Sequence, residues 1–127
     1  MEAGKEFNIK PFGGRALMSM RLEKNWGAWT LDYRPDFTAK ETGLDMFINW
    51  DKDFIGKEKA KSENSSNKLT PLIVETNDID VTSNEAVMNG DQSIGYVTSG
   101  GFAHFVNKSV AFTFIDQNKI CLLYTSD

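Results

Sequence analysis

The chain has 127 residues, of which 40% are hydrophobic and 12% aromatic, enough to bury a core of its own. Its net charge is −4 and it carries no basic stripe, which argues against nucleic acid as the main partner. No apolar run approaches the roughly 20 residues of a membrane helix and no signal region precedes the first charges, so we expect a cytoplasmic location and no membrane partner.

The first substantial element that the sequence predicts is a helix over residues 15–24, which are strong helix formers with one apolar face. The Gly13-Gly14 pair breaks a weakly helical start before it, and Gly27 should end it. If the helix persists to Glu23, then Arg21 and Glu23 point about 200° apart around its axis. If the chain is already extended there, the two share one face, and the pattern leaves both arrangements open.

Four further features are expected before residue 64. They are a capping box of Thr38 and Glu41 at the start of residues 39–44, a strand over residues 44–50, a helix over residues 57–63, and Asp53 as the N-cap of that helix. The polar run over residues 61–68 is then the best candidate for a linker.

Beyond the linker the pattern changes to antiparallel strands. They are expected over residues 69–76, just before the hairpin signal Asn89-Gly90, over residues 93–99 and over residues 106–116. Residues 98–101, Thr-Ser-Gly-Gly, are interpreted as a tight turn at a corner of the sheet, because no Lys-Ser/Thr follows as a phosphate loop would need. The expected fold class is therefore α+β, divided at about residue 64.

Four short motifs stand in the chain in a fixed order. They are Gly13-x-Arg15 followed by Ser19-Met20-Arg21-Leu22-Glu23, then Glu41-Thr42-Gly43-Leu44, then Asp53-Phe54-Ile55-Gly56, and finally Gly95-Tyr96-Val97-Thr98-Ser99-Gly100 followed by Lys108-Ser109-Val110-Ala111. Over roughly residues 4–116 they resemble the glycine-cleavage T-protein family of folate-dependent aminomethyltransferases. With Trp26-Gly-Ala-Trp29, the chain is similar to the C-terminal folate-binding region of FAD-dependent dimethylglycine and sarcosine dehydrogenases.

The resemblance implies how the chain is organised. Residues 1–63 would end a folate-binding α+β aminomethyltransferase domain, and residues 64–120 would begin a C-terminal antiparallel β-barrel whose last strands are missing. Residues 121–127 look like a reading frame through a sequencing adapter, the alternative being a real terminal strand. They include Cys121, the one cysteine, which permits neither an internal disulfide nor a cysteine metal site.

The function that the resemblance implies is folate-dependent one-carbon transfer. In such a dehydrogenase, an upstream FAD domain of the same chain oxidises an N-methylglycine substrate, and tetrahydrofolate captures the one-carbon unit. The family's catalytic Asp and the FAD-binding fingerprint lie upstream of these residues, so we expect a fragment that is not active alone. The alternatives are a stand-alone glycine cleavage aminomethyltransferase, a non-enzymatic folate-binding relative, and a β-rich binding module without folate.

Glu23 is the strongest candidate for a cofactor contact. A pterin ring presents an exocyclic amine beside a ring N–H, and one carboxylate can accept both hydrogen bonds. The family places its pterin-binding Glu in this Arg-Leu-Glu motif. Without the motif, a solvated Glu near the end of a helix would be the ordinary interpretation.

Two further residues are cofactor candidates on weaker grounds. Lys52 stands where T-proteins carry an Arg that contacts folate, and it would meet the glutamate tail or else be an ordinary turn lysine. Trp26, with Trp29 and Trp50, could stack on the pterin, although tryptophans more often serve a core or a domain interface.

Arg21 and His104 are given structural roles. We expect Arg21 to brace the fold through a carboxylate rather than to contact substrate. His104 is the only histidine, and neither a catalytic triad nor a metal site can be built from one His without matching ligands.

Overall fold

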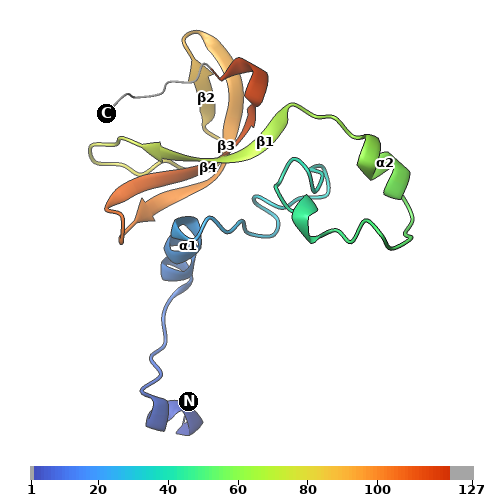
Figure 1. Cartoon of the computed structure of the whole chain (residues 1–127). Helices are drawn as coiled ribbons and strands as arrows, with labels where there is room; N and C mark the ends of the chain where they lie inside the picture. Colours follow the sequence, from blue (N-terminus) through green and yellow to red (C-terminus); the bar gives the residue numbers. More distant parts are fainter. Residues whose placement is uncertain (1, 121–127) are drawn as a thin grey trace.

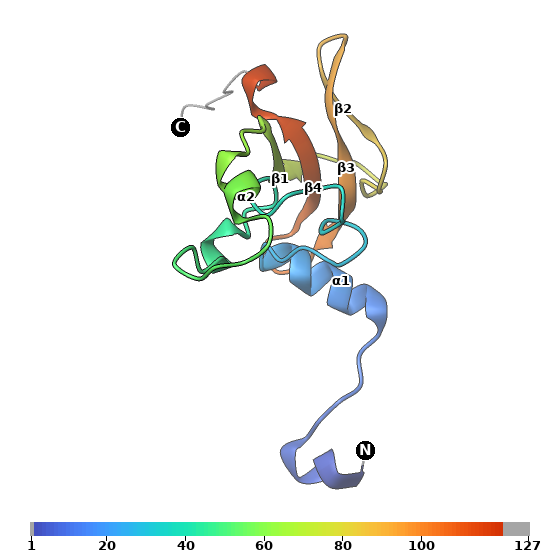
Figure 2. The ribbon, with the colours of Figure 1, turned by 90° about the vertical axis from the view of Figure 1, so that its right-hand side faces the viewer.

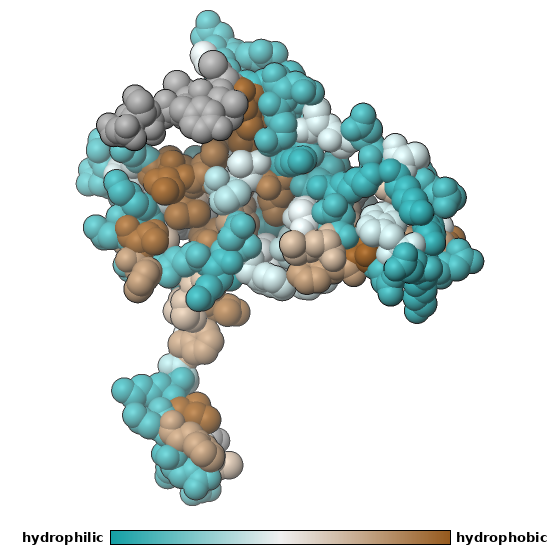
Figure 3. All heavy atoms as spheres, in the orientation of Figure 1, coloured by the Kyte–Doolittle hydropathy of each residue, from teal (hydrophilic) through white to brown (hydrophobic). Residues whose placement is uncertain are grey.

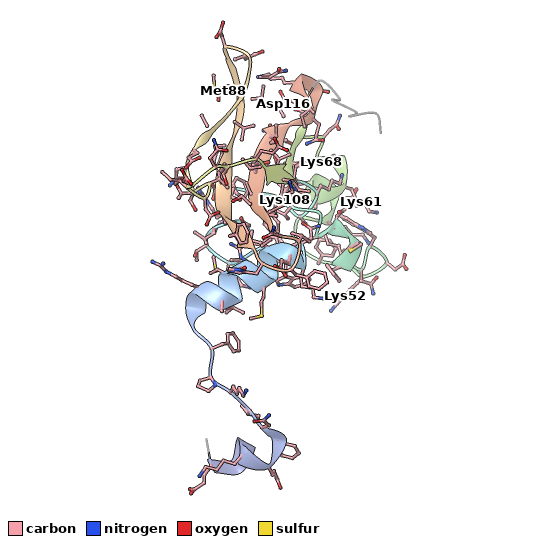
Figure 4. All side chains as sticks on the ribbon, turned by 90° about the vertical axis from the view of Figure 1, so that its left-hand side faces the viewer. Lys52, Lys61, Lys68, Met88, Lys108 and Asp116 are labelled. Carbon is pink, nitrogen blue, oxygen red and sulfur yellow. The ribbon has the colours of Figure 1, made fainter. Side chains whose placement is uncertain are left out.

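One four-stranded antiparallel sheet dominates the structure, a computed structural model that describes residues 2–120 (Figure 1). The strands are β1 (Asn67–Val74), β2 (Ala86–Asn89), β3 (Gln92–Ala103) and β4 (Lys108–Asp116). They lie in the order β1-β4-β3-β2, so the connection from β1 to β2 crosses from one edge of the sheet to the other. Met88 lies close to the turn of the β2–β3 hairpin, and Lys108 and Asp116 mark the two ends of β4 (Figure 4).

The helical elements precede the sheet, except for one short turn after β4. They are η1 (Glu2–Phe7), α1 (Gly14–Glu23), η2 (Asp45–Phe47), α2 (Lys57–Ser62) and, after β4, η3 (Gln117–Lys119). Figure 2 shows α1 lying across the end of the sheet, with η1 set apart on an extended segment. Hydrophobic side chains lie along that segment (Figure 3), and Ile9 and Phe12 on it are exposed. The α+β class is confirmed.

Hydrophobic residues are buried on both faces of β4. Its alternate residues Val110 and Phe112 pack with Leu22 of α1. Ala111, between them, packs on the other face with Val81 and Val97. Alternation along the strand therefore places α1 on one face and the β1–β2 connection on the other.

Two glycines of β3 allow other parts of the chain to approach closely. A Cβ on Gly100 would lie 2.6 Å from the Val81 carbonyl oxygen, and one on Gly95 would lie 2.1 Å from that of Phe114. The prediction of a tight turn over residues 98–101 is wrong, because Gly100 and Gly101 pair with β4 inside the strand. Gly95 and Gly100 therefore serve close packing rather than a reversal of the chain.

The other local predictions had mixed outcomes. The capping box is confirmed, since the Thr38 amide donates to Glu41 Oε2 at 2.8 Å and the Glu41 amide to Thr38 Oγ1 at 3.3 Å. The predicted strand over residues 44–50 is wrong, because the chain there closes local hydrogen bonds and forms η2 instead. α2 is present, but its N-cap is Gly56, at φ 86°, rather than Asp53.

Two further points concern the end of the chain and membrane-spanning helices. Those made for residues 121–127 fall outside the described residues. In the part that is described, no helix is both long enough and apolar enough to cross a membrane.

Candidate functional site

The end of α1 places two charged side chains on different sides of the helix. α1 remains helical through Glu23, which settles the arrangement that the sequence left open. Arg21 is buried, whereas Glu23 is half-buried. The helical period therefore turns one charge into the fold and the other towards a groove on the surface.

Arg21 braces the fold through a carboxylate, as predicted. Its Nη1 donates to Asp32 Oδ2, and also lies 3.4 Å from the Trp26 carbonyl oxygen. The guanidinium carbon lies 5.4 Å from the centre of the Phe112 ring, within the range of a cation–π contact. Arg21 thus ties the last turn of α1 to the following loop and to β4.

Asp32 is the centre of this buried cluster, and the sequence analysis did not single it out. Besides Arg21, its carboxylate accepts hydrogen bonds from the Ala28 amide at 2.8 Å, from Thr98 Oγ1 at 2.5 Å and from Ser99 Oγ at 2.7 Å. The fully buried carboxylate thus has four hydrogen-bond donors, and one of them, Arg21, also carries the opposite charge. The only sequence signal was the expectation that Arg21 needs an acidic partner.

A bulge in β3 lets two consecutive residues serve Asp32. Neighbouring side chains of a regular strand face opposite sides of the sheet. The pairing of β3 with β4 shifts register between Val97 and Ser99, so Thr98 is an extra residue on its strand. Bulges of this kind redirect side chains. The hydroxyls of Thr98 and Ser99 therefore both reach one carboxylate.

Glu23 lies at the edge of a groove between α1 and the β3–β4 connection. Its Oε1 accepts a hydrogen bond from the Phe105 amide at 2.7 Å. Ser19, one turn earlier on α1, donates to the Phe102 carbonyl oxygen at 2.6 Å and fixes the helix against β3. The groove has a volume of about 410 Å³ and is lined by Arg15, Ala16, Ser19, Met20, Glu23, His104 and Phe105.

The structure does not bring all the predicted cofactor residues into this groove. Lys52 is an exposed turn residue whose amide donates to the Asn49 carbonyl oxygen at 3.3 Å (Figure 4). Figure 1 shows the loop before α2 and the β3–β4 connection on opposite sides of the molecule. Trp26 follows α1 and is exposed, and its backbone rather than its ring contacts Arg21. Of the three candidates, only Glu23 lines the groove.

The remaining aromatic and histidine predictions have partial answers. Trp29 is exposed rather than buried in a core, and its ring meets Tyr33 edge-on at 5.8 Å. Trp29 and Tyr33 line a separate, mainly apolar cavity of about 430 Å³. His104 is exposed and packs edge-on against Phe102 at 5.1 Å, so its structural role stays a prediction. Within residues 2–120, no group of three or more acidic, His or Cys side chains is placed to hold a metal ion.

Comparison with known proteins gives two family matches. Residues 1–52 match the GCVT N-terminal domain, and residues 67–121 match the glycine cleavage T-protein C-terminal barrel domain. Mitochondrial dimethylglycine dehydrogenases of mouse and human are 37% and 35% identical to the chain over 120 residues. An aminomethyltransferase of Caldanaerobacter subterraneus is 34% identical over 121 residues.

These matches cover nearly the whole chain but only part of each relative. They include 91% of the chain for the two dehydrogenases and 92% for the aminomethyltransferase. The chain spans 14% of the length of each of these dehydrogenases and 32% of that of the aminomethyltransferase.

Proposed function

The chain belongs to the glycine cleavage T-protein family, and we propose that it forms part of a tetrahydrofolate site for one-carbon transfer. In this proposal residues 1–63 belong to the folate-binding domain and residues 64–120 to the barrel domain. The observation that carries it is the Glu23 carboxylate, which lies at the edge of a groove and is held there by the Phe105 amide.

The position of Glu23 suits the edge of a pterin ring. Each carboxylate oxygen has two lone pairs, so Oε1 can keep the Phe105 amide and still accept a second donor. Among the described residues, no hydrogen bond to Oε2 is found, which leaves it for the neighbouring donor of the ring. Two parallel, charge-assisted hydrogen bonds would fix the orientation of the ring as well as its affinity.

The contribution of this chain to the reaction would be binding and orientation. Tetrahydrofolate supplies the nucleophilic amine that accepts the one-carbon unit. Glu23 would set the direction of the pterin. Ser19 would hold α1 against β3, so that the carboxylate keeps its place beside the β3–β4 connection. Orientation of this kind can supply a large part of a rate enhancement. Lys52 and Trp26 stay predicted contacts of the glutamate tail and the pterin.

The finer assignment is to an N-methylglycine dehydrogenase of the dimethylglycine or sarcosine type, with FAD bound by another domain of the same polypeptide. The identity to the two mitochondrial dimethylglycine dehydrogenases supports it. We propose a cytoplasmic location for the chain, whereas those two relatives are mitochondrial enzymes. Neither nucleic acid nor a membrane is a proposed partner.

A stand-alone aminomethyltransferase is the second candidate, favoured by the 34% identity to the Caldanaerobacter enzyme. The two differ in flavin. The full gene product should carry stoichiometric FAD, detected by its absorbance after purification, if the dehydrogenase assignment holds. A full product without flavin would favour the aminomethyltransferase.

The folate proposal is tested by replacing Glu23 with Gln and measuring tetrahydrofolate binding anaerobically by two-dimensional NMR, which also detects weak binding. We expect the dissociation constant to rise by about tenfold or more, because a charge-assisted bidentate contact is reduced to a single neutral one. Glu58→Gln, on the exposed face of α2, is the matched control and should bind like the unaltered chain. Equal affinity of the Glu23 variant, or no binding by the unaltered chain, would contradict the proposal.

A further inference from the structure

We propose that Asn89, in the β2–β3 hairpin, is a site of spontaneous deamidation, and that its conversion to aspartate or isoaspartate releases the hairpin from η3. Figure 1 shows the hairpin at the periphery of the sheet, with η3 next to it. Asn89 does not line the groove beside α1, so the modification is independent of folate binding.

Gly90 makes Asn89 the asparagine that is least hindered for this reaction. Deamidation begins when the backbone nitrogen of the following residue attacks the side-chain amide carbon of the asparagine. A Cβ on the following residue hinders that approach, and glycine has none. Asn89 is the only asparagine of the chain that a glycine follows. The sequence therefore favours attack at this position over every other asparagine.

The turn of the hairpin leaves the Gly90 nitrogen available. Asn89 pairs with Gln92, so Gly90 and Asp91 form a two-residue loop. Gly90 has a φ of 59° and Asp91 does not have a positive φ, as in a type II′ turn. In the described part of the chain, no hydrogen bond from the Gly90 amide is found. Asn89 and Gly90 are both exposed, so water reaches the reacting atoms.

The reaction consumes only water. The Gly90 nitrogen forms a bond to Asn89 Cγ, the bond from Cγ to Nδ2 breaks, and ammonia leaves with the proton of the Gly90 amide. Water then opens the cyclic imide. Cleavage at the former side-chain carbonyl gives aspartate, whereas cleavage at the backbone carbonyl gives isoaspartate, in which the main chain runs through the side-chain carbons.

The Asn89 side chain joins the hairpin to η3 in its amide form. Its Nδ2 donates to the Lys119 carbonyl oxygen at 3.1 Å. A carboxylate can only accept hydrogen bonds, so at this place it would face and repel another acceptor. The Lys119 ammonium lies 3.7 Å from Asp116 Oδ2 and so already has an acidic partner. Deamidation therefore removes this contact, and isoaspartate also lengthens the main chain at the end of β2.

The first experiment follows deamidation of the folded, unaltered chain by peptide mass spectrometry during incubation in mildly alkaline buffer. Asn107 is the internal control, because it is exposed in the turn between β3 and β4 but is followed by Lys108. Conversion should be about tenfold faster at Asn89, with isoaspartate among the products. Asn89→Gln should stop conversion at this position, since the longer side chain must close a larger ring. A rate at Asn89 no higher than at Asn107 would overturn the proposal.

The second experiment measures hydrogen exchange to test the release of η3. Asn89→Asp imitates the aspartate product, and Asn89→Gln keeps an amide donor. The Gln117 amide donates to the Ser66 carbonyl oxygen at 3.0 Å, and it should exchange a few-fold faster in Asn89→Asp than in the unaltered chain. The Thr113 amide, inside β4, is the control and should not change. Unchanged exchange at Gln117 in Asn89→Asp, or equal acceleration in Asn89→Gln, would overturn the release by charge.

Discussion

Two Arg–Asp pairs in the first half of the chain are chemically alike and lie in opposite environments. In the pair Arg21–Asp32, the two side chains are 8% and 0% exposed. In the pair Arg34–Asp36, they are 39% and 53% exposed. The exposed pair has the more complete bidentate geometry, with Arg34 Nε 3.2 Å from Asp36 Oδ1 and Nη2 2.5 Å from Oδ2.

The surroundings of an ion pair, more than its geometry, decide how much the pair contributes to stability. Water screens the exposed pair, and such pairs contribute little to stability. The buried pair lacks that screening, so removal of one partner leaves the other charged in an apolar setting. Asp32 also has three further donors from the 24–33 loop and β3. The buried pair is therefore part of how the two halves of the chain hold together.

The largest expected effect is from Asp32→Ala. It leaves the Arg21 guanidinium buried without its counter-charge, and breaking a buried pair from one side typically costs about 3–5 kcal/mol. We expect the free energy of unfolding in urea to fall by that order, or the chain to lose its cooperative transition. Asp36→Ala is the matched control and should unfold like the unaltered chain.

A double variant tests whether Arg21 and Asp32 act as a pair. Arg21→Met with Asp32→Asn removes both charges, so it should be less destabilised than the sum of the single variants. Additive effects would mean that the two side chains do not act as a pair. Burial of an ion pair would then not explain any difference between the buried and the exposed pair.

A smaller effect is expected from the hydroxyls on the bulge of β3. Thr98→Val and Ser99→Ala each remove one donor to the buried Asp32 carboxylate. A hydrogen bond to a charged group contributes about 1.5–3 kcal/mol, so each variant should lose about that much in urea unfolding. Thr70→Val is a control on β1, whose hydroxyl bonds only neutral groups. A loss no larger than that of the control would show that the bulge does not serve Asp32.

Local patterns predicted the parts of this molecule that depend on neighbouring residues. The helix before Gly27, the capping box of Thr38 and Glu41 and the strand-rich second half follow from periodicity and turn chemistry. The predicted strand over residues 44–50 failed because an apolar, aromatic run forms a strand only where a sheet edge can receive it. The turn predicted over residues 98–101 is wrong because, in sequence, a glycine needed for close approach, such as Gly100, cannot be told from a glycine of a turn.

The candidate site was predictable only as far as its motif. The sequence pointed to Glu23, and to a carboxylate partner for Arg21, but it did not identify Asp32. That partner is chosen by tertiary packing and by a register shift in β3, neither of which leaves a local pattern. The contact between Phe105 and Glu23 likewise joins residues far apart in sequence. Arg15 stands in the motif, but only the structure shows that it lines the groove.

The smallest expected effect is on the exposed pair, and it depends on pH. The hydrogen bond from Arg34 holds the pKa of the Asp36 carboxyl below its ordinary value of 3.8. A lowered pKa stabilises the fold above the ordinary value, and this contribution is lost as the pH falls through the folded-state value. Arg34→Gln should therefore melt within about 1 °C of the unaltered chain at pH 7 in 0.5 M salt, where the pair is screened. Any difference at low salt should vanish on acidification below the folded-state pKa. If Arg34→Gln instead destabilised the chain as much as Asp32→Ala, burial would not be what distinguishes the two pairs.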